Sequence, residues 1–418
     1  HYPLRRQRQM CIRDRLILSV TLFTFGGLFA LYAKSLTIVC CGLALVIFFL
    51  PFINRYSYLK CPSTSKFFNV IYMLLLIWEL FIVFYPFLMN QSFISDGYSL
   101  RVDYTLPAYF LPLILLLGRD SVRLDYLLKI VPGLLGFSLL IAILNKQFWF
   151  EDYANLTFDE YQDALQMTGP LMSLLNLGLL LLPFVSYIPQ KYIKVMVFAN
   201  AFLSLMFCVI AARRGGVVID LLYVIAYIYF SFFCGKRKIP KWLVFCVVGA
   251  FIVVGLYFLQ NSMLVSYLLE RGIEDTRSYV EFFLYNDFSE HYADWIFGRG
   301  INGAYYCPLF KNVMRQMIET GYLFMILKGG IIYLFLYVAL YLHAIIRAFK
   351  SGNILLKIMA AELIIRLFTL YPFGLPAFGY TDLLCWIFIL YCETTSFGKN
   401  KASAKNHSNT HSLINTRL

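Results

Sequence analysis

Two adjacent arginines followed by two glycines form an unusual charged segment between apolar runs. Arg213 and Arg214 precede Gly215 and Gly216 in CVIAARRGGVVID. Guanidinium groups bind phosphate oxygens two at a time, glycines allow a close approach of the backbone, and a following helix start favours negative charge. The segment therefore predicts an anion site. The alternative is that both side chains reach lipid headgroups or pair with acids nearby.

A second group of candidate residues lies in the long polar segment 260–320. It contains Arg277 and Arg299 among carboxylates and tyrosines. These are Glu281, Asp287, Glu290, Asp294, Tyr279, Tyr285, Tyr292, Tyr305 and Tyr306. Carboxylates accept hydrogen bonds from sugar hydroxyls and flat rings contact sugar C–H groups, so the segment favours a sugar site with Tyr279 among the binding residues. The alternative is an amphipathic surface helix with aromatic residues at a membrane interface.

The same segment contains Gly298, Gly300 and Gly303 in the spacing of a dinucleotide-binding fingerprint. That fingerprint needs a preceding strand and a βαβ unit, and neither is predicted. The pattern therefore predicts a turn that needs glycine. No Cys or His spacing indicates a zinc site, and no cofactor is expected.

Several charges fall inside apolar runs. Glu362 and Arg366 are four residues apart, so we expect them to neutralise each other on one helix. Glu79, Asp220 and Lys328 could form a proton or ion pathway, but structural pairing is the favoured interpretation.

The composition sets the class of protein that must position these residues. Hydrophobic residues make up 60 % and charged residues 14 %, and the mean hydropathy is +0.70. A soluble enzyme or nucleic-acid binder is excluded, because soluble domains carry about 25 % charged residues. We expect an all-α polytopic membrane protein with about twelve transmembrane helices. The predicted spans are 16–33, 36–53, 67–88, 106–118, 126–144, 170–188, 193–211, 217–234, 242–259, 322–343, 354–371 and 381–394.

The net charge of +13 follows the predicted topology. With the N-terminus in the cytoplasm, the inner segments carry most Lys and Arg and the outer segments most acids, as the positive-inside rule requires. Both termini are then cytoplasmic, and residues 16–394 form one transmembrane domain with outer loops at 145–169 and 260–320. The basic residues 1–15 resemble translated sequencing-adapter sequence, and the alternative is an ordinary basic cytoplasmic N-terminus. The polar residues 395–418 predict a disordered tail.

Three segments together resemble the bacterial O-antigen polymerase and ligase superfamily, which includes Wzy-type polymerases. ARRGG at 212–216 is similar to the family's Ser-Arg-Gly segment, with Arg214 in the arginine position. The long outer loop has an early arginine, Arg277, and a later GRG at 298–300. IETGYLFMILKGG resembles the segment that leads from the loop into the next span, although Glu319 stands where the family has histidine.

The resemblance implies a glycosyltransferase of the bacterial inner membrane that needs no metal or nucleotide sugar. It would polymerise the repeat units of a surface polysaccharide, such as lipopolysaccharide O-antigen or capsule, from glycans carried on undecaprenyl pyrophosphate. A chain-length regulator would be a partner and nucleic acid would not. Arg214 and Arg277 would act on the pyrophosphate, supported by Arg213 and Arg299, and Glu319 or His291 would be the base.

Two alternatives remain open. An O-antigen ligase, which transfers finished glycan to lipid A core, shares the expected fold and arginines. A flippase for lipid-linked oligosaccharides would be a transporter, and transporters commonly show repeated halves and broken helices. No repeated halves are evident in the sequence.

Overall fold

Helices make up most of the structure. The computed structural model describes residues 15–26, 34–53, 63–88, 105–118, 124–144, 149, 158–211, 213–233, 276–309, 313–371 and 376–394. The helices are Arg15–Gly26, α2 (Lys34–Ile53), α3 (Lys66–Leu88), α5 (Thr105–Ala108), α6 (Leu124–Leu144), α8 (Phe158–Leu181), α9 (Lys191–Ile210), α10 (Arg214–Ile228), α13 (Thr276–Glu290), α14 (Tyr292–Phe297), α15 (Gly321–Lys350), α16 (Ile354–Thr369) and α17 (Tyr380–Thr394). Shorter helical turns are η2 (Leu111–Leu117), η3 (Leu182–Tyr187) and η4 (Tyr229–Phe233), and β1 (Tyr305–Tyr306) pairs antiparallel with β2 (Met314–Arg315).

Within the part of the chain that the structure describes, five helical stretches are long and apolar enough to cross a membrane. They are Leu36–Ile53, Lys66–Leu88, Lys191–Ile210, Gly215–Phe232 and Gly321–Lys350. The composition predicts a helical membrane protein, and the described residues are mostly helical and include helices that could span a membrane.

Other segments differ in detail from the predicted spans. α8 begins at Phe158, inside the predicted outer loop 145–169. The predicted span 106–118 is divided between α5 and the 3-10 turn η2. The predicted span 242–259 lies outside the described residues.

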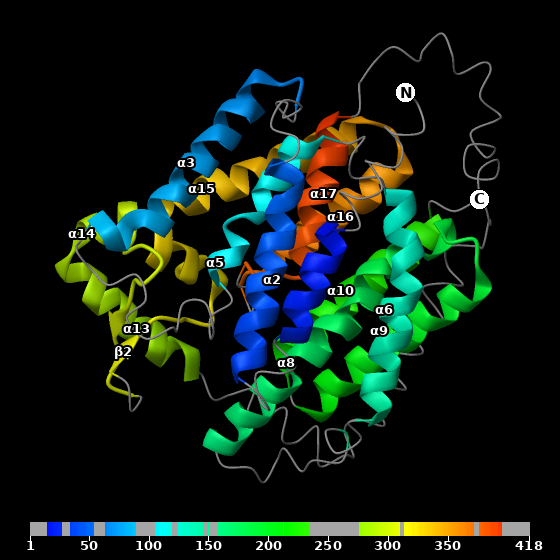
Figure 1. Cartoon of the computed structure of the whole chain (residues 1–418), viewed down its shortest axis with the longest axis horizontal. Coiled ribbons are helices and arrows are strands. Elements are labelled where there is room, and N and C mark those ends of the chain that lie inside the picture. The colour runs from blue at the N-terminus through cyan, green and yellow to red at the C-terminus, as the bar shows by residue number, and fades with distance from the viewer. Residues whose placement is uncertain are drawn as a thin grey trace.

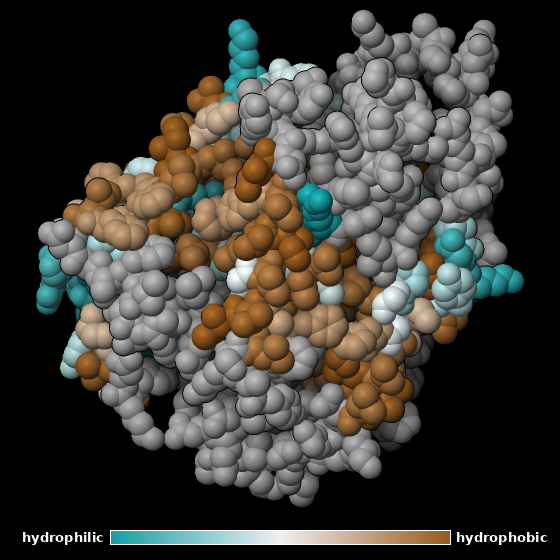
Figure 2. Space-filling model, viewed as in Figure 1, coloured by the Kyte–Doolittle hydropathy of each residue, from teal (hydrophilic) through white to brown (hydrophobic). Residues whose placement is uncertain are grey.

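Large apolar side chains are exposed along the long helices. On α3 they include Ile77, Phe84 and Phe87, and on α15 they include Ile331 and Phe335. On the face shown in Figure 2, apolar side chains cover the middle of the molecule over α2 and α3, and hydrophilic side chains lie mainly at its edges. Exposed apolar surface of this extent marks an interaction with lipid or with another protein.

α15 is the central helix of one half of the bundle. It packs against α3, α16 and α17, and its first half also contacts α14 (Figure 1). The helix is not continuous, because Gly330 has non-helical backbone angles (φ 69°, ψ −177°). The sequence KGG at 328–330 therefore marks a break inside the predicted span.

The residues of segment 260–320 that the structure describes form a small folded unit, here called the loop subdomain (276–309 and 313–320). Its core contains Leu284, Phe288, Tyr305 and Cys307, which pack against Phe324 and its neighbours on α15. Cys307 is a buried free thiol. In Figure 1 the subdomain lies beside the N-terminal half of α15.

The expected pairing of Glu362 with Arg366 is wrong. The guanidinium of Arg366 instead reaches across to α17 and binds Asp382 at two points, Nε to Oδ1 (2.7 Å) and Nη2 to Oδ2 (3.0 Å). A forked pair of this kind matches guanidinium to carboxylate better than a contact along one helix. Neither carboxylate oxygen of Glu362 accepts a hydrogen bond from Arg366.

Candidate functional site

The turn at 298–303 and the break in α15 are held together through their backbones. The amide of Arg299 donates to the carbonyl of Leu327 (2.8 Å) and the amide of Gly300 to the carbonyl of Lys328 (2.9 Å). These carbonyls would otherwise lack partners, because the helical pattern stops at Gly330. Two motifs that the sequence placed 30 residues apart, GRG and KGG, are thus one structural element.

Glycine is required on both sides of this contact. A Cβ on Gly330 would lie 1.9 Å from the carbonyl oxygen of Ile296, and a Cβ on Gly298 would lie 2.5 Å from the amide nitrogen of Gly329. Gly298 and Gly330 also have φ near +70°, with ψ near 180°, a region essentially restricted to glycine. The sequence predicts a turn at the GxGxxG spacing, and the structure confirms this turn.

Side chains reinforce the contact. Nζ of Lys328, which is fully buried, donates to the carbonyls of Ile301 (2.8 Å) and Gly303 (2.9 Å). The indole of Trp78 on α3 donates to the carbonyl of Gly329 (2.7 Å). Lys328 is thus bonded to carbonyls of the turn and fixes the turn on α15. This role is structural, as favoured from the sequence, but these two partners are backbone carbonyls and not another charged side chain.

Arg299 is engaged by two carboxylates of the loop subdomain. Its Nε donates to Asp294 (2.6 Å) and its Nη1 to Asp287 (2.7 Å), while the guanidinium also lies 4.7 Å from the ring centre of Phe288. Burial opposes the charge, but the two aspartates more than offset this effect and raise the pKa of Arg299. The arginine therefore ties α13, α14 and the 298–303 turn together, and its charge is already balanced.

A different group of polar residues gathers where the loop subdomain joins α15, here called the loop-base cluster (Glu281, Tyr305, Arg315, Glu319 and Thr320). The hydroxyl of Thr320 donates to the carboxylate of Glu281 on α13. Tyr305 and Arg315 are opposite each other in the β1–β2 pair. Burial raises the pKa of the Tyr305 hydroxyl; Arg315 lowers it, and Glu319 and Glu281 raise it. Arg315, Glu319 and Glu281 therefore each lie close enough to Tyr305 to affect its ionisation.

Two of the residues predicted from the sequence, Arg277 and Glu319, lie at the end of the loop subdomain where the loop-base cluster is found. Glu319 is exposed and directly precedes Thr320. Residue 277 lies on α13 four residues before Glu281, one helical turn away. Arg277 and Glu319 are therefore positioned at the same end by the contact between Thr320 and Glu281. Tyr279 is exposed on the same part of α13.

His291, the other candidate base, lies elsewhere. It is exposed and directly follows Glu290, the last residue of α13. Glu281 and Glu290 are nine positions apart on this helix, which is about 14 Å at 1.5 Å per residue. The structure therefore does not bring His291 to the loop-base cluster.

The arginine–glycine segment forms the start of α10. Arg213 precedes the helix and its amide donates to the carbonyl of Cys208 (2.8 Å), while its guanidinium lies 5.8 Å from the ring centre of Phe207. Gly216 faces Cys208, since a Cβ there would lie 2.6 Å from the thiol sulfur. Gly216 therefore allows α9 and α10 to approach each other, which is a packing role that the sequence did not indicate. Gly215 and the backbone of Arg214 lie in the first turn of the helix.

A small cavity lies between α3, α15 and α17. Its polar lining consists of Glu79, Tyr333, Tyr337 and Asp382. Among the described residues, no His, Cys, Asp and Glu group could hold a metal ion.

The sequence did not indicate that Glu281, Thr320 and Arg315 lie close together. Glu281 and Thr320 are 39 residues apart, and no local spacing connects them. The only available signal was that Glu281 lies one helical turn after Arg277. Comparison with protein-family models, with curated proteins and with solved structures finds no match for this chain.

Proposed function

We propose that the chain is an integral-membrane glycosyltransferase of the O-antigen polymerase type. It joins oligosaccharide repeat units that are carried on undecaprenyl pyrophosphate. The chemistry takes place at the end of the bundle that carries the loop subdomain. The proposal rests on the sequence resemblance and on the contact between Thr320 and Glu281.

The observation that carries the proposal is the contact between Thr320 and Glu281. It positions residue 277 and Glu319 at one end of a loop that is itself fixed to a broken helix. An arginine and an exposed carboxylate are the two groups that the reaction needs, one for the leaving phosphate and one for a proton. The position of His291 beyond the far end of α13 favours Glu319 as the base.

The proposed reaction is a substitution at the anomeric carbon of the donor sugar. A hydroxyl of the acceptor sugar attacks that carbon, a new C–O bond forms, and the bond to the pyrophosphate oxygen breaks. Glu319 accepts the hydroxyl proton. The pyrophosphate keeps the bonding electrons, and the charges of Arg277 and Arg214, with Arg213 in support, stabilise it. Arg299 has a positioning role in this scheme, because Asp287 and Asp294 already balance its charge.

The proposed orientation places the loop subdomain in the periplasm and both termini in the cytoplasm of a bacterial inner-membrane protein with about twelve spans. The basic inner segments support this orientation. It puts the loop-base cluster and the start of α10 on the side where lipid-linked repeat units are assembled into polymer.

Surface polysaccharide from a strain that lacks the gene tests the proposal. Loss of the gene should leave single repeat units, and the wild-type gene should restore the polymer ladder. Arg214→Ala, Arg277→Ala and Glu319→Gln should each fail to restore it, while Glu290→Gln, an exposed carboxylate at the far end of α13, should succeed. Full polymer from both arginine variants would contradict the arginine assignment. Free polymer in the deletion strain would indicate the ligase instead.

A lipid-linked-oligosaccharide flippase is the second candidate, and the break in α15 favours it. Discontinuous helices often frame transport sites. The carbonyls at this break, however, are bonded to the loop subdomain and to Trp78, so they do not line an open site. Movement of intact lipid-linked units across vesicles, without polymer, would support the flippase.

A further inference from the structure

The end of α14 and the turn that follows it lie beside two candidate membrane spans rather than away from the bundle. The amide of Ile301 donates to the carbonyl of Ile82 on α3 (3.0 Å). Ile82 precedes the end of α3 by six residues, about 9 Å along the helix, and α3 continues with the exposed apolar side chains of Phe84 and Phe87. The turn therefore contacts α3 at a level that is still inside its apolar stretch.

The outward face of α14 is apolar. Ile296 and Phe297 are 48 % and 46 % exposed. The one carboxylate of α14, Asp294, is bonded to Arg299, and Trp295 stacks on Tyr285 of α13. Asp294 and Trp295 are thus directed into the loop subdomain, and the exposed face of α14 carries no charge.

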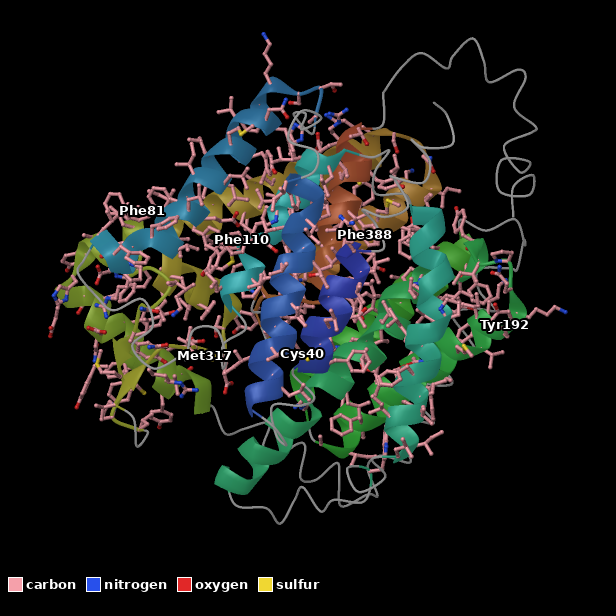
Figure 3. The ribbon with its side chains drawn as sticks, in the orientation of Figure 1. Cys40, Phe81, Phe110, Tyr192, Met317 and Phe388 are labelled. Atoms are coloured by element: carbon pink, nitrogen blue, oxygen red, sulfur yellow. The ribbon has the colours of Figure 1, made fainter. Side chains whose placement is uncertain are left out.

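This apolar face continues the exposed apolar surface of the spans. The ring of Phe297 stacks on Trp78 at 6.1 Å, and Trp78 in turn contacts Phe81, which Figure 3 labels on α3 close to α14. On the other side, the carbonyl of Ile296 touches Gly330, and the next residue, Ile331, is exposed. The half-buried rings of Trp78 and Phe81 on α3 and the exposed side chain of Ile331 on α15 therefore flank Ile296 and Phe297.

The irregular backbone of the turn meets the condition for lying at membrane depth. Non-helical backbone is tolerated there only where protein groups satisfy its polar atoms. The amides of residues 299, 300 and 301 donate to carbonyls of α15 and α3, and Lys328 donates to the carbonyls of Ile301 and Gly303.

We propose that α14 and the 298–303 turn form an interfacial anchor, in which Ile296 and Phe297 insert into the acyl chains of the adjacent leaflet. The occupant of this face is bilayer lipid. The loop subdomain is then held at a fixed depth beside the membrane surface, where a lipid-linked substrate presents its head group. The proposal concerns the seating of the loop and does not depend on the transfer reaction.

Photo-crosslinking of the full chain to lipid tests this proposal. p-Benzoylphenylalanine replaces Phe297, Ile296 or, as a control of matched exposure, Tyr306 of β1, which is 51 % exposed. The protein is reconstituted in phosphatidylethanolamine and phosphatidylglycerol vesicles with radiolabelled acyl chains. Because position 297 already carries an aromatic ring, the replacement there retains the contact with Trp78.

We expect several-fold more labelled lipid on the protein from positions 296 and 297 than from position 306. Equal labelling at all three positions would overturn the proposal, and so would crosslinks from 296 and 297 that join two copies of the chain instead of lipid. Absence of polymer formation by the same protein would bear on the proposed function alone.

Discussion

The buried ammonium group of Lys328 donates a 2.8 Å hydrogen bond to the carbonyl of Ile301 and so joins the broken helix to the loop turn. Lys328→Met removes this bond and the one to Gly303 and leaves two buried carbonyls without a donor, at a cost of about 1–3 kcal/mol for each group. We expect a lower midpoint of thermal unfolding in detergent and faster proteolysis within the loop subdomain. Lys350→Met, at the exposed end of the same helix, is the control and should change neither measurement.

The close approach at the helix break predicts a difference between two glycines of similar backbone conformation. Gly118 has φ 71° and ψ 159°, near the angles of Gly330, but a Cβ there would meet no atom within 4 Å. Gly118→Ala should therefore cost only the backbone strain, about 1–3 kcal/mol. Gly330→Ala adds a collision with Ile296 and should lower the unfolding midpoint further or prevent folding. Equal effects would show that the break does not depend on close contact.

The ion pair across α16 and α17 predicts unequal roles for two buried acids. Asp382→Asn leaves the Arg366 charge uncompensated in the interior, which typically costs about 3–5 kcal/mol. Glu362→Gln keeps the shape of a side chain that does not pair with Arg366, so its effect on thermal unfolding should be small. If Glu362→Gln destabilised the protein as much as Asp382→Asn, this result would support the pairing of Glu362 with Arg366 that was expected from the sequence.

The position of Arg299 between two aspartates predicts that arginine and acid variants have the same kind of effect. Arg299→Ala removes the charged hydrogen bonds to both aspartates, and Asp287→Asn weakens only the one to residue 287. Each such bond is worth about 1.5–3 kcal/mol, so both variants should loosen the loop subdomain, Arg299→Ala more than Asp287→Asn. Polymer formation and resistance of the loop to proteolysis should fall together in both variants. A direct pyrophosphate ligand would behave differently: Arg299→Ala would abolish transfer, and Asp287→Asn would leave it intact.

Local features of the structure could be predicted from the sequence. The glycines at 298 and 300 form a turn, and the apolar runs at 36–53, 67–88 and 193–211 are helices close to the predicted bounds. Backbone conformation and helix periodicity depend on neighbouring residues, which the sequence displays directly.

The partners of the charged side chains could not be predicted in the same way. Spacing suggested Glu362 for Arg366, but the guanidinium reaches Asp382 on the next helix. The acids of the loop were interpreted as a sugar site, yet Asp287 and Asp294 bind Arg299. Such pairs form only after helices pack, because a long side chain can turn toward any of several elements.

The proposed function requires that the chain itself joins lipid-linked repeat units. The most direct measurement is the length of the glycan formed when purified full-length protein, in vesicles, meets undecaprenyl-pyrophosphate-linked repeat units without nucleotide sugar. We expect products longer than one repeat, and a rate lower by about 10²–10⁴-fold for Glu319→Gln, the usual contribution of a general base. Folded wild-type protein that leaves the repeat units unjoined would contradict the proposed function.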